Sequence, residues 1–206
     1  GIENSELIEG IVLDKEKVHV GMPSKIEKVK VALLDVALEI KSTEMDAKIS
    51  IDDPSKLQGF LDQEETMLKD MVNKVIESGA NVLVCQKGID DVAQYLLSEN
   101  NIYAVRRVKE SDMERLAKAT GGKVVSNLSA LDKSKLGSAG KVEEIKVGED
   151  DMTYISGCEN PKAVTLLIKG GTQHVVDEVE RAVTDALGDV VAALKTGKVV
   201  GGAGAV

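Results

Sequence analysis

The sequence predicts an α/β fold in which helices flank a sheet core, followed by a smaller α+β segment after Pro161. Three observations predict it. Aliphatic and helical segments alternate between residues 81 and 126, and a β-α-β-α-β run of this kind forms a parallel sheet with right-handed crossovers. An amphipathic helical pattern precedes that run at residues 57–76. A second one, at about residues 172–195, has its own complete apolar stripe, so we expect a second hydrophobic core.

The N-terminal part of the chain is predicted to be mostly β-structure. Residues 10–20 have the pattern of a strand, a turn and a second strand, and Gly21-Met22-Pro23 then breaks it. Residues 29–40 are aliphatic and β-branched enough for one or two strands. Residues 47–51 alternate with a period of two, which indicates a further strand.

A long helix is expected next. Asp52-Asp53-Pro54-Ser55 combines acids with a proline in the first turn, which is a helix-start signal. At about 100° per residue, the apolar residues of the pattern fall on one half of the helix. These residues are Leu57, Phe60, Leu61, Met67, Leu68, Met71, Val72, Val75 and Ile76.

Two acids, Glu64 and Glu65, interrupt this stripe and set apart an N-terminal group of Leu57, Phe60 and Leu61. Two interpretations of that group remain open. One is that these three residues belong to the ordinary hydrophobic core. This interpretation is weakened because it would bury a carboxylate without a partner, which costs free energy. The other is a helix that leaves the domain body and exposes a small apolar patch, and such patches tend to be binding sites.

The remaining elements follow in chain order. Ser111 is a good N-cap with Glu114 at the third position of a capping box, and Gly121-Gly122 ends that helix. The predicted elements are strands at 81–85, 102–108 and 123–126, helices at 89–99 and 111–120, a hairpin of 141–147 and 152–157, a strand at 163–168 and the helix at 172–195.

Composition excludes several functional classes. The net charge of −9 and a pI near 4.9 argue against general nucleic-acid binding, which needs a basic face. No apolar run approaches the length of a membrane span, and we expect no membrane partner. Two cysteines, Cys85 and Cys158, and two histidines do not make a disulfide framework or a metal site. Buried free thiols and a cytoplasmic location are expected.

Two features of the C-terminal segment have unremarkable interpretations when taken alone. Ile168-Lys169-Gly170-Gly171-Thr172 places a glycine pair before a helix N-terminus, where anions bind, but it matches no phosphate-loop fingerprint, and a tight turn is favoured. Asp185 lies on the polar side of its helix, where a solvated carboxylate is the default. We find no Ser-His-Asp or Cys-His arrangement.

Long motifs spread over nearly the whole chain resemble the archaeal group II chaperonins, the thermosomes. They include Phe60-Leu61-Asp62-Gln63-Glu64-Glu65 and Gly157-Cys158-Glu159-Asn160-Pro161-Lys162. The matching segments are residues 5–15, 53–65, 79–91, 104–109, 157–162, 170–172 and 174–181. The chain begins at Gly1 and ends in Gly-Gly-Ala-Gly-Ala-Val, and we expect it to be part of a longer protein.

The resemblance implies a domain organisation. Residues 1–162 look like the apical domain, which binds unfolded polypeptide, and residues 52–78 look like its helical protrusion, a built-in lid that would use Leu57, Phe60 and Leu61. Residues 163–206 look like the C-terminal half of the intermediate domain. From the resemblance we expect the family's equatorial ATPase domain, with its phosphate loop, to lie outside this chain.

The resemblance also implies an ATP-dependent parent. Asp185 matches the family's aspartate that positions the attacking water, and Gly202 matches a glycine near the nucleotide, although Ala203 interrupts the family's three consecutive glycines. ATP and Mg²⁺ are expected only in the intact parent, and the fragment itself is expected to bind no cofactor, to hydrolyse nothing and to hold no metal. Expected partners are non-native polypeptides and neighbouring subunits of a double ring.

Two other classes of function stay open at this point. A Rossmann-like enzyme or small-ligand binder would use the β-α-β-α-β unit, but the turn Cys85-Gln86-Lys87-Gly88 lacks fingerprint glycines. A purely structural interaction domain is the third possibility. Suppression of the aggregation of a denatured protein would favour a chaperonin, and saturable nucleotide binding would favour the Rossmann-like alternative.

Overall fold

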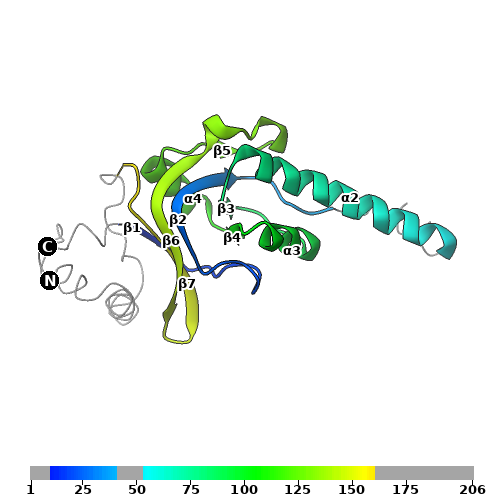
Figure 1. The fold of residues 1–206 in the computed structure, drawn as a ribbon, viewed down its shortest axis with the longest axis horizontal. Coiled ribbons are helices and arrows are strands. Elements are labelled where there is room, and N and C mark those ends of the chain that lie inside the picture. The colour runs from blue at the N-terminus through cyan, green and yellow to red at the C-terminus, as the bar shows by residue number, and fades with distance from the viewer. Residues whose placement is uncertain (1–9, 41–52, 161–206) are drawn as a thin grey trace, which may run out of the picture.

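The structure is a computed structural model that describes residues 10–40 and 53–160. Strands and helices alternate along most of this part of the chain (Figure 1). The elements are β1 (Gly10–Leu13), β2 (Lys25–Leu34), α2 (Pro54–Ser78), β3 (Val82–Cys85), α3 (Asp91–Glu99), β4 (Tyr103–Val105), α4 (Glu110–Thr120), β5 (Val124–Val125), the 3₁₀ turns η2 (Leu128–Ala130) and η3 (Lys133–Lys135), β6 (Gly137–Val147) and β7 (Asp150–Ser156).

The described strands form one mixed sheet in the order β1-β7-β6-β2-β3-β4, with the short β5 also paired to β2. β2, β3, β4 and β5 are parallel to one another where they pair, so the predicted β-α-β-α-β run is confirmed. The other half is antiparallel, and β6 and β7 make the predicted hairpin, with Gly148 at a φ of 64° in its turn. The sheet is therefore mixed rather than all-parallel.

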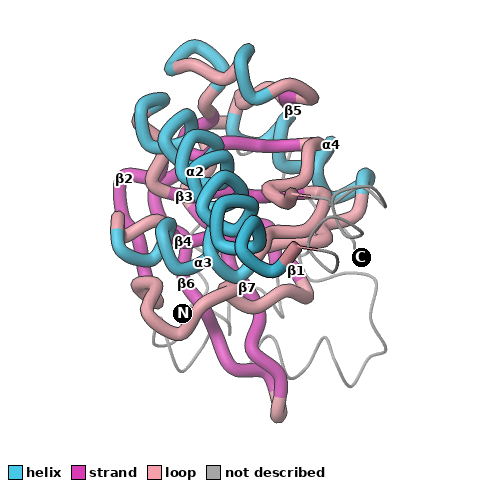
Figure 2. Tube along the Cα trace, turned by 90° about the vertical axis from the view of Figure 1, so that its right-hand side faces the viewer, coloured by secondary structure: helices cyan, strands magenta, loops and turns pink. Residues whose placement is uncertain are grey.

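Helices cover both faces of the sheet, as α2 and α3 lie on one side and α4 on the other (Figures 1 and 2). Alternation along β2 shows why. Val31 and Leu33 point into the cluster that contains the buried face of α4, whereas Leu34 points into the cluster that contains α2 and α3. Both clusters are largely aliphatic, and the three layers bury all of β3 and residues 31–34 of β2 on both faces, as a parallel sheet requires.

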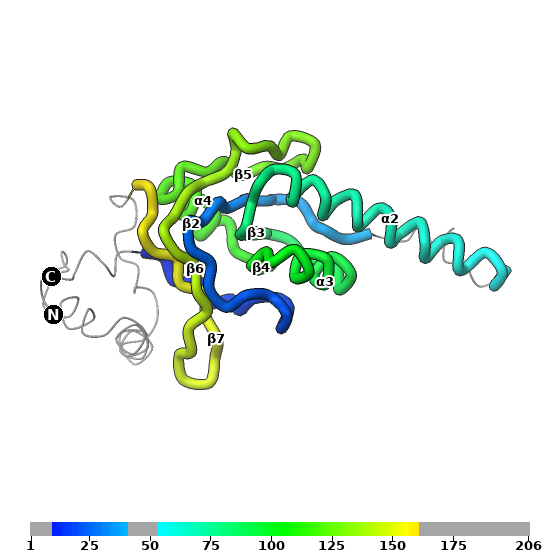
Figure 3. The backbone as a smooth tube through the Cα atoms, in the orientation of Figure 1, coloured from blue at the N-terminus to red at the C-terminus, as the bar shows by residue number. Residues whose placement is uncertain are grey.

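The predicted second strand within residues 10–20 is wrong. Residues 14–24 form a loop that runs past the edge strand β4 and lies beside α3 (Figure 3), and the Val18 N–H donates to the carbonyl oxygen of Ala104 at 2.9 Å. This contact shields part of an otherwise open sheet edge. The side chain of Val20 is 88% exposed, whereas the alternating pattern predicted a strand at this position.

Other boundaries shift by a few residues. β2 begins at Lys25, four residues earlier than expected, and Leu38 makes only an isolated parallel bridge with Ile89 instead of a second strand. β6 begins at Gly137 because it pairs with β2 there, opposite Val31. The predicted strands at 47–51 and 163–168, and the helix at 172–195, lie outside the described residues.

Candidate functional site: the projecting helix α2

The helix α2 begins and ends where its sequence signals place it. Asp53 is the N-cap, and its carboxylate accepts a hydrogen bond from the Ser55 N–H at 3.1 Å, while Pro54 occupies the first helical position. Gly79 ends the helix in the left-handed conformation with a φ of 92°, and its N–H donates to the Ile76 carbonyl at 3.0 Å. Both termini are set by local chemistry.

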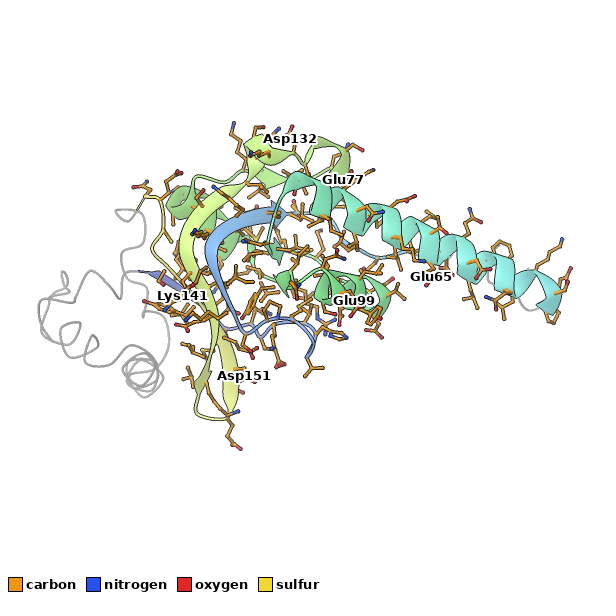
Figure 4. All side chains as sticks on the ribbon, viewed as in Figure 1. Glu65, Glu77, Glu99, Asp132, Lys141 and Asp151 are labelled. Atoms are coloured by element: carbon orange, nitrogen blue, oxygen red, sulfur yellow. The ribbon has the colours of Figure 1, made fainter. Side chains whose placement is uncertain are left out.

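Only the C-terminal half of α2 packs against the body. Leu68, Val72 and Val75 are buried in the cluster shared with α3, whereas no residue from 54 to 67 is buried. At about 1.5 Å per residue, that N-terminal half extends roughly 20 Å. Figure 1 shows α2 projecting beyond the sheet and beyond α3, and Figure 4 labels Glu65 near the middle of the helix.

The projecting half has apolar side chains on its surface. Leu57 is 40% exposed, Leu61 is 49% exposed and Met67 is 43% exposed, while Phe60 is half-buried. Leu57 and Leu61 lie on the same helical face as Leu68, because residues that are three, four, seven or eleven positions apart share a face. The apolar stripe therefore keeps the same helical phase on both sides of Glu64 and Glu65, and its N-terminal part is exposed where the body of the domain ends.

Acidic and polar side chains surround this apolar strip. Glu65 forms an ion pair with Lys69 at 3.9 Å in which both side chains are 52% exposed, a geometry worth little in water. The Gln58 side-chain amide donates to the Asp62 carboxylate at 2.8 Å one turn apart. The arrangement suits weak, geometry-tolerant contact with apolar chains rather than a pocket for one ligand.

A second exposed apolar group lies on α3 and the loop between β1 and β2. Tyr95 is 52% exposed and Val92 is 38% exposed, on the side of α3 opposite its buried stripe. The ring of His19 packs edge-on against Tyr95 with 6.2 Å between ring centroids, and its Nδ1 accepts the Gly21 N–H at 2.9 Å. Val20, next to His19 in the chain, is exposed as well, and sequence reasoning missed all of these exposed apolar residues. The signal was two large apolar residues outside the amphipathic stripe of α3.

Neither cysteine is available for chemistry in the folded protein. Cys85 and Cys158 are buried free thiols, which confirms the expectation. Burial raises the pKa of each thiol to about 11, so both stay protonated at neutral pH. The Cys85 thiol also donates to the Val36 carbonyl at 3.3 Å.

The described residues do not fit a nucleotide. A polar hollow of about 520 Å³ lies between residues 14–18, the arginine pair Arg106 and Arg107, and the hairpin turn at 149–151, but it has more carboxylates than cations. α3 and α4 both begin with acids, which oppose phosphate binding at a helix N-terminus. Within residues 10–40 and 53–160, no group of three potential metal ligands occurs. Asp185 and Gly202 lie outside the described residues.

The helices of the described part include none that is long and apolar enough to cross a membrane. The longest, α2, alternates charged and apolar residues over its full length.

Comparison with known proteins gives one consistent result. The model of the TCP-1/cpn60 chaperonin family matches residues 1–206. The thermosome subunit beta of Archaeoglobus fulgidus is 59% identical over 204 residues, covering 99% of this chain and 37% of that protein. The thermosome subunit alpha of Thermoplasma acidophilum is 58% identical over 205 residues, covering all of this chain and 38% of that protein. The chain thus spans little more than a third of the length of these relatives.

A solved structure is similar as well. The open-state monomer of a group II chaperonin from Methanococcoides burtonii aligns with a TM-score of 0.65 at 45% sequence identity. The alignment covers 93% of this chain and 41% of that one. The mixed sheet with its flanking helices is thus the fold of a group II chaperonin segment, as the sequence predicted.

Proposed function

Because this chain belongs to the TCP-1/cpn60 chaperonin family, we propose that its described part is the domain of a group II chaperonin subunit that binds non-native polypeptide. The observation that carries the proposal is the projection of α2, with Leu57 and Leu61 exposed beyond the body. Residues 1–162 would form this apical domain, and residues 163–206 would form the C-terminal half of an intermediate domain. The alternative of a Rossmann-like small-ligand domain is not favoured.

The proposed binding mode follows from the shape of the surface. Non-native chains expose apolar side chains in no fixed arrangement, so a capture surface needs accessible apolar area and tolerance of geometry. Burying one Leu or Phe side chain is worth roughly 1.5–3 kcal/mol. Leu57, Phe60 and Leu61 would therefore bind weakly on their own, and several subunits in a ring would add avidity. Val92 and Tyr95 on α3 add exposed apolar area on the same side of the sheet as α2.

A role as a built-in lid is the second part of the proposal. A helix that projects roughly 20 Å can reach beyond its own subunit, and its apolar strip can be covered by the same strip of neighbouring subunits when a chamber closes. Neighbouring subunits of a double ring and unfolded polypeptide are thus the proposed partners, in the cytoplasm. Both would compete for Leu57, Phe60 and Leu61.

For the whole protein we propose dependence on ATP and Mg²⁺. Asp185 would orient the water for attack on the terminal phosphate, and Gly202 would approach the nucleotide with its backbone. ATP hydrolysis would supply the free energy for the cycle of opening and closing. Since the described residues offer no phosphate cradle, we expect the 206-residue chain alone to bind no nucleotide tightly.

The test is a triple substitution of Leu57, Phe60 and Leu61 to serine in the 206-residue chain. We expect reduced suppression of the aggregation of a heat-denatured, unrelated protein, with little loss of folding stability. The matched control replaces three exposed polar residues of the same helix, Lys56→Ser, Gln63→Ser and Asn73→Ser, and should leave suppression unchanged. Undiminished suppression by the apolar triple variant at full stability would show that this strip is not the capture surface.

A further inference from the structure

The chain leaves the body after β2 alongside the start of α3. The Leu38 N–H donates to the Gly88 carbonyl at 3.0 Å, and the Asp90 N–H donates to the Leu38 carbonyl at 2.9 Å. These bonds make the isolated parallel bridge between Leu38 and Ile89, and the Leu38 side chain is fully buried. The pairing of β2 with β3 is thus resumed beyond the ends of both strands.

The next bond of this parallel pattern would join the Ile40 N–H to the main-chain carbonyl of Asp90. That carbonyl is already engaged, because it accepts the Gln94 N–H at 2.9 Å as the first turn of α3. The Ile40 N–H instead donates to the Asp90 side chain, to Oδ2, at 3.2 Å. Asp90 therefore accepts the first hydrogen bond of α3 with its main-chain carbonyl and the next hydrogen bond of the parallel pairing with its carboxylate.

This use of the carboxylate leaves α3 without its side-chain cap. Asp90 is the N-cap residue, with φ −63° and ψ 154°, the backbone conformation that a capping aspartate adopts. A capping carboxylate would accept from the N–H of Val92 or Ala93, the second and third helical positions. No such bond forms here. The Asp90 side chain is turned toward Ile40, away from the helix it could cap.

A neighbouring ion pair supports the same junction. The Glu39 carboxylate lies 3.6 Å from the Arg107 guanidinium, which connects the departing chain to the segment after β4. Gly88 makes room for this pair, since a Cβ at that position would overlap the Glu39 carboxylate. The Glu39–Arg107 ion pair and the Ile40–Asp90 hydrogen bond therefore both hold the chain where it leaves the body.

We propose that Asp90 is a positioning residue with two alternative orientations. In the one observed, its carboxylate holds the Ile40 N–H and docks the departing chain against α3. In the other, it caps Val92 and Ala93, which stabilises the first turn of α3 and releases Ile40. Asp90 would thus link the departure of the chain that leads to α2 with the stability of the helix that carries Val92 and Tyr95. This inference does not depend on the proposed function.

The experiment measures residue-level amide hydrogen exchange by NMR in the 206-residue chain and in variants at position 90. The Leu83 and Val84 amides of β3 report global unfolding, and all rates are compared with theirs. In Asp90→Ser, the hydroxyl can cap α3 but is too short to reach Ile40. We expect the Ile40 amide to exchange about fivefold faster, and the Val92 and Ala93 amides to exchange about fivefold slower, which is the effect of gaining one typical cap.

Three further variants separate positioning from a general structural role. In Asp90→Ala, Ile40 should be released without protection of Val92 and Ala93. In Asp90→Asn, the amide oxygen can still accept, so Ile40 should exchange within about twofold of the unsubstituted chain. Asp91→Ser removes an adjacent exposed acid and should change neither site. Unchanged Ile40 exchange in both Asp90→Ala and Asp90→Ser, or released Ile40 with unprotected Val92 and Ala93 in Asp90→Ser, would overturn the proposal.

Discussion

Two leucines on one face of α2 give a sharp test of where the body of the domain ends. Leu61 and Leu68 are seven residues apart, nearly two helical turns, so they lie on the same stripe. Leu68 is 4% exposed and packs in the cluster with α3, whereas Leu61 is 49% exposed. Leu→Ala leaves helix propensity almost unchanged at either site. Any difference between the two variants therefore reports packing against the body.

The expected magnitudes follow from burial. Truncation of a buried Leu costs about 2–5 kcal/mol, and Leu68 should fall near the lower end because it is the last buried residue toward the tip. Leu61 has already half of its surface in water, so Leu61→Ala should cost about 1 kcal/mol or less. The two variants should differ by at least about 1 kcal/mol in the free energy of unfolding.

Equilibrium unfolding in urea, followed by far-UV circular dichroism, measures this difference. With a slope of about 2 kcal/mol per molar, the midpoint should fall by about 1 M in Leu68→Ala and by less than about 0.5 M in Leu61→Ala. Val72→Ala is the positive control, since Val72 is 1% exposed in the same cluster. Equal losses at Leu61 and Leu68 would refute the projection of α2. Small losses at both would refute the anchoring of its C-terminal half.

Three other predictions follow from the same structure. Burial raises the pKa of the Cys85 and Cys158 thiols from 9.0 to about 11. Between pH 9 and pH 11 both thiols therefore stay protonated in the folded state, whereas they ionise in the unfolded chain. Their stabilising contribution is therefore complete below pH 9 and is lost as the pH rises toward 11, and Cys85→Ala/Cys158→Ala should flatten that decline in urea melts. Gly157→Ala should cost about 1–3 kcal/mol in thermal or urea melts, because φ is 67° and the new Cβ would lie 3.0 Å from the Gly140 Cα. Gly140→Ala makes only ordinary contacts and should cost less. In the full-length protein, Asp185→Ala should lower ATP turnover at least about 100-fold in a phosphate-release assay while nucleotide affinity stays within a few-fold, and unchanged turnover would exclude the proposed role.

The termini of α2, the β-α-β-α-β unit and the family resemblance could be predicted from the sequence because each rests on local signals. The start of α4 could not, since the expected N-cap Ser111 lies inside a helix that begins at Glu110 after Lys109. Asp53, Pro54 and Gly79 specify the ends of α2 through their own backbone preferences. Hydrophobic periodicity specified which face of α2 is apolar. The burial of Cys85 followed from the apolar run Val82-Leu83-Val84 that precedes it in the chain. None of these inferences required contacts between distant residues.

Long-range contacts decided the rest. β6 starts at Gly137 because β2 offers a partner at Val31, although Gly137-Ser138-Ala139-Gly140 has weak strand propensity of its own. Residues 14–24 form a loop across the edge of β4 in spite of their alternating pattern. Tertiary contacts also decide at which residue the apolar stripe of α2 stops being buried. Leu61 and Leu68 have the same helical phase, and only the extent of the sheet and α3 beneath them determines that one is buried and the other exposed.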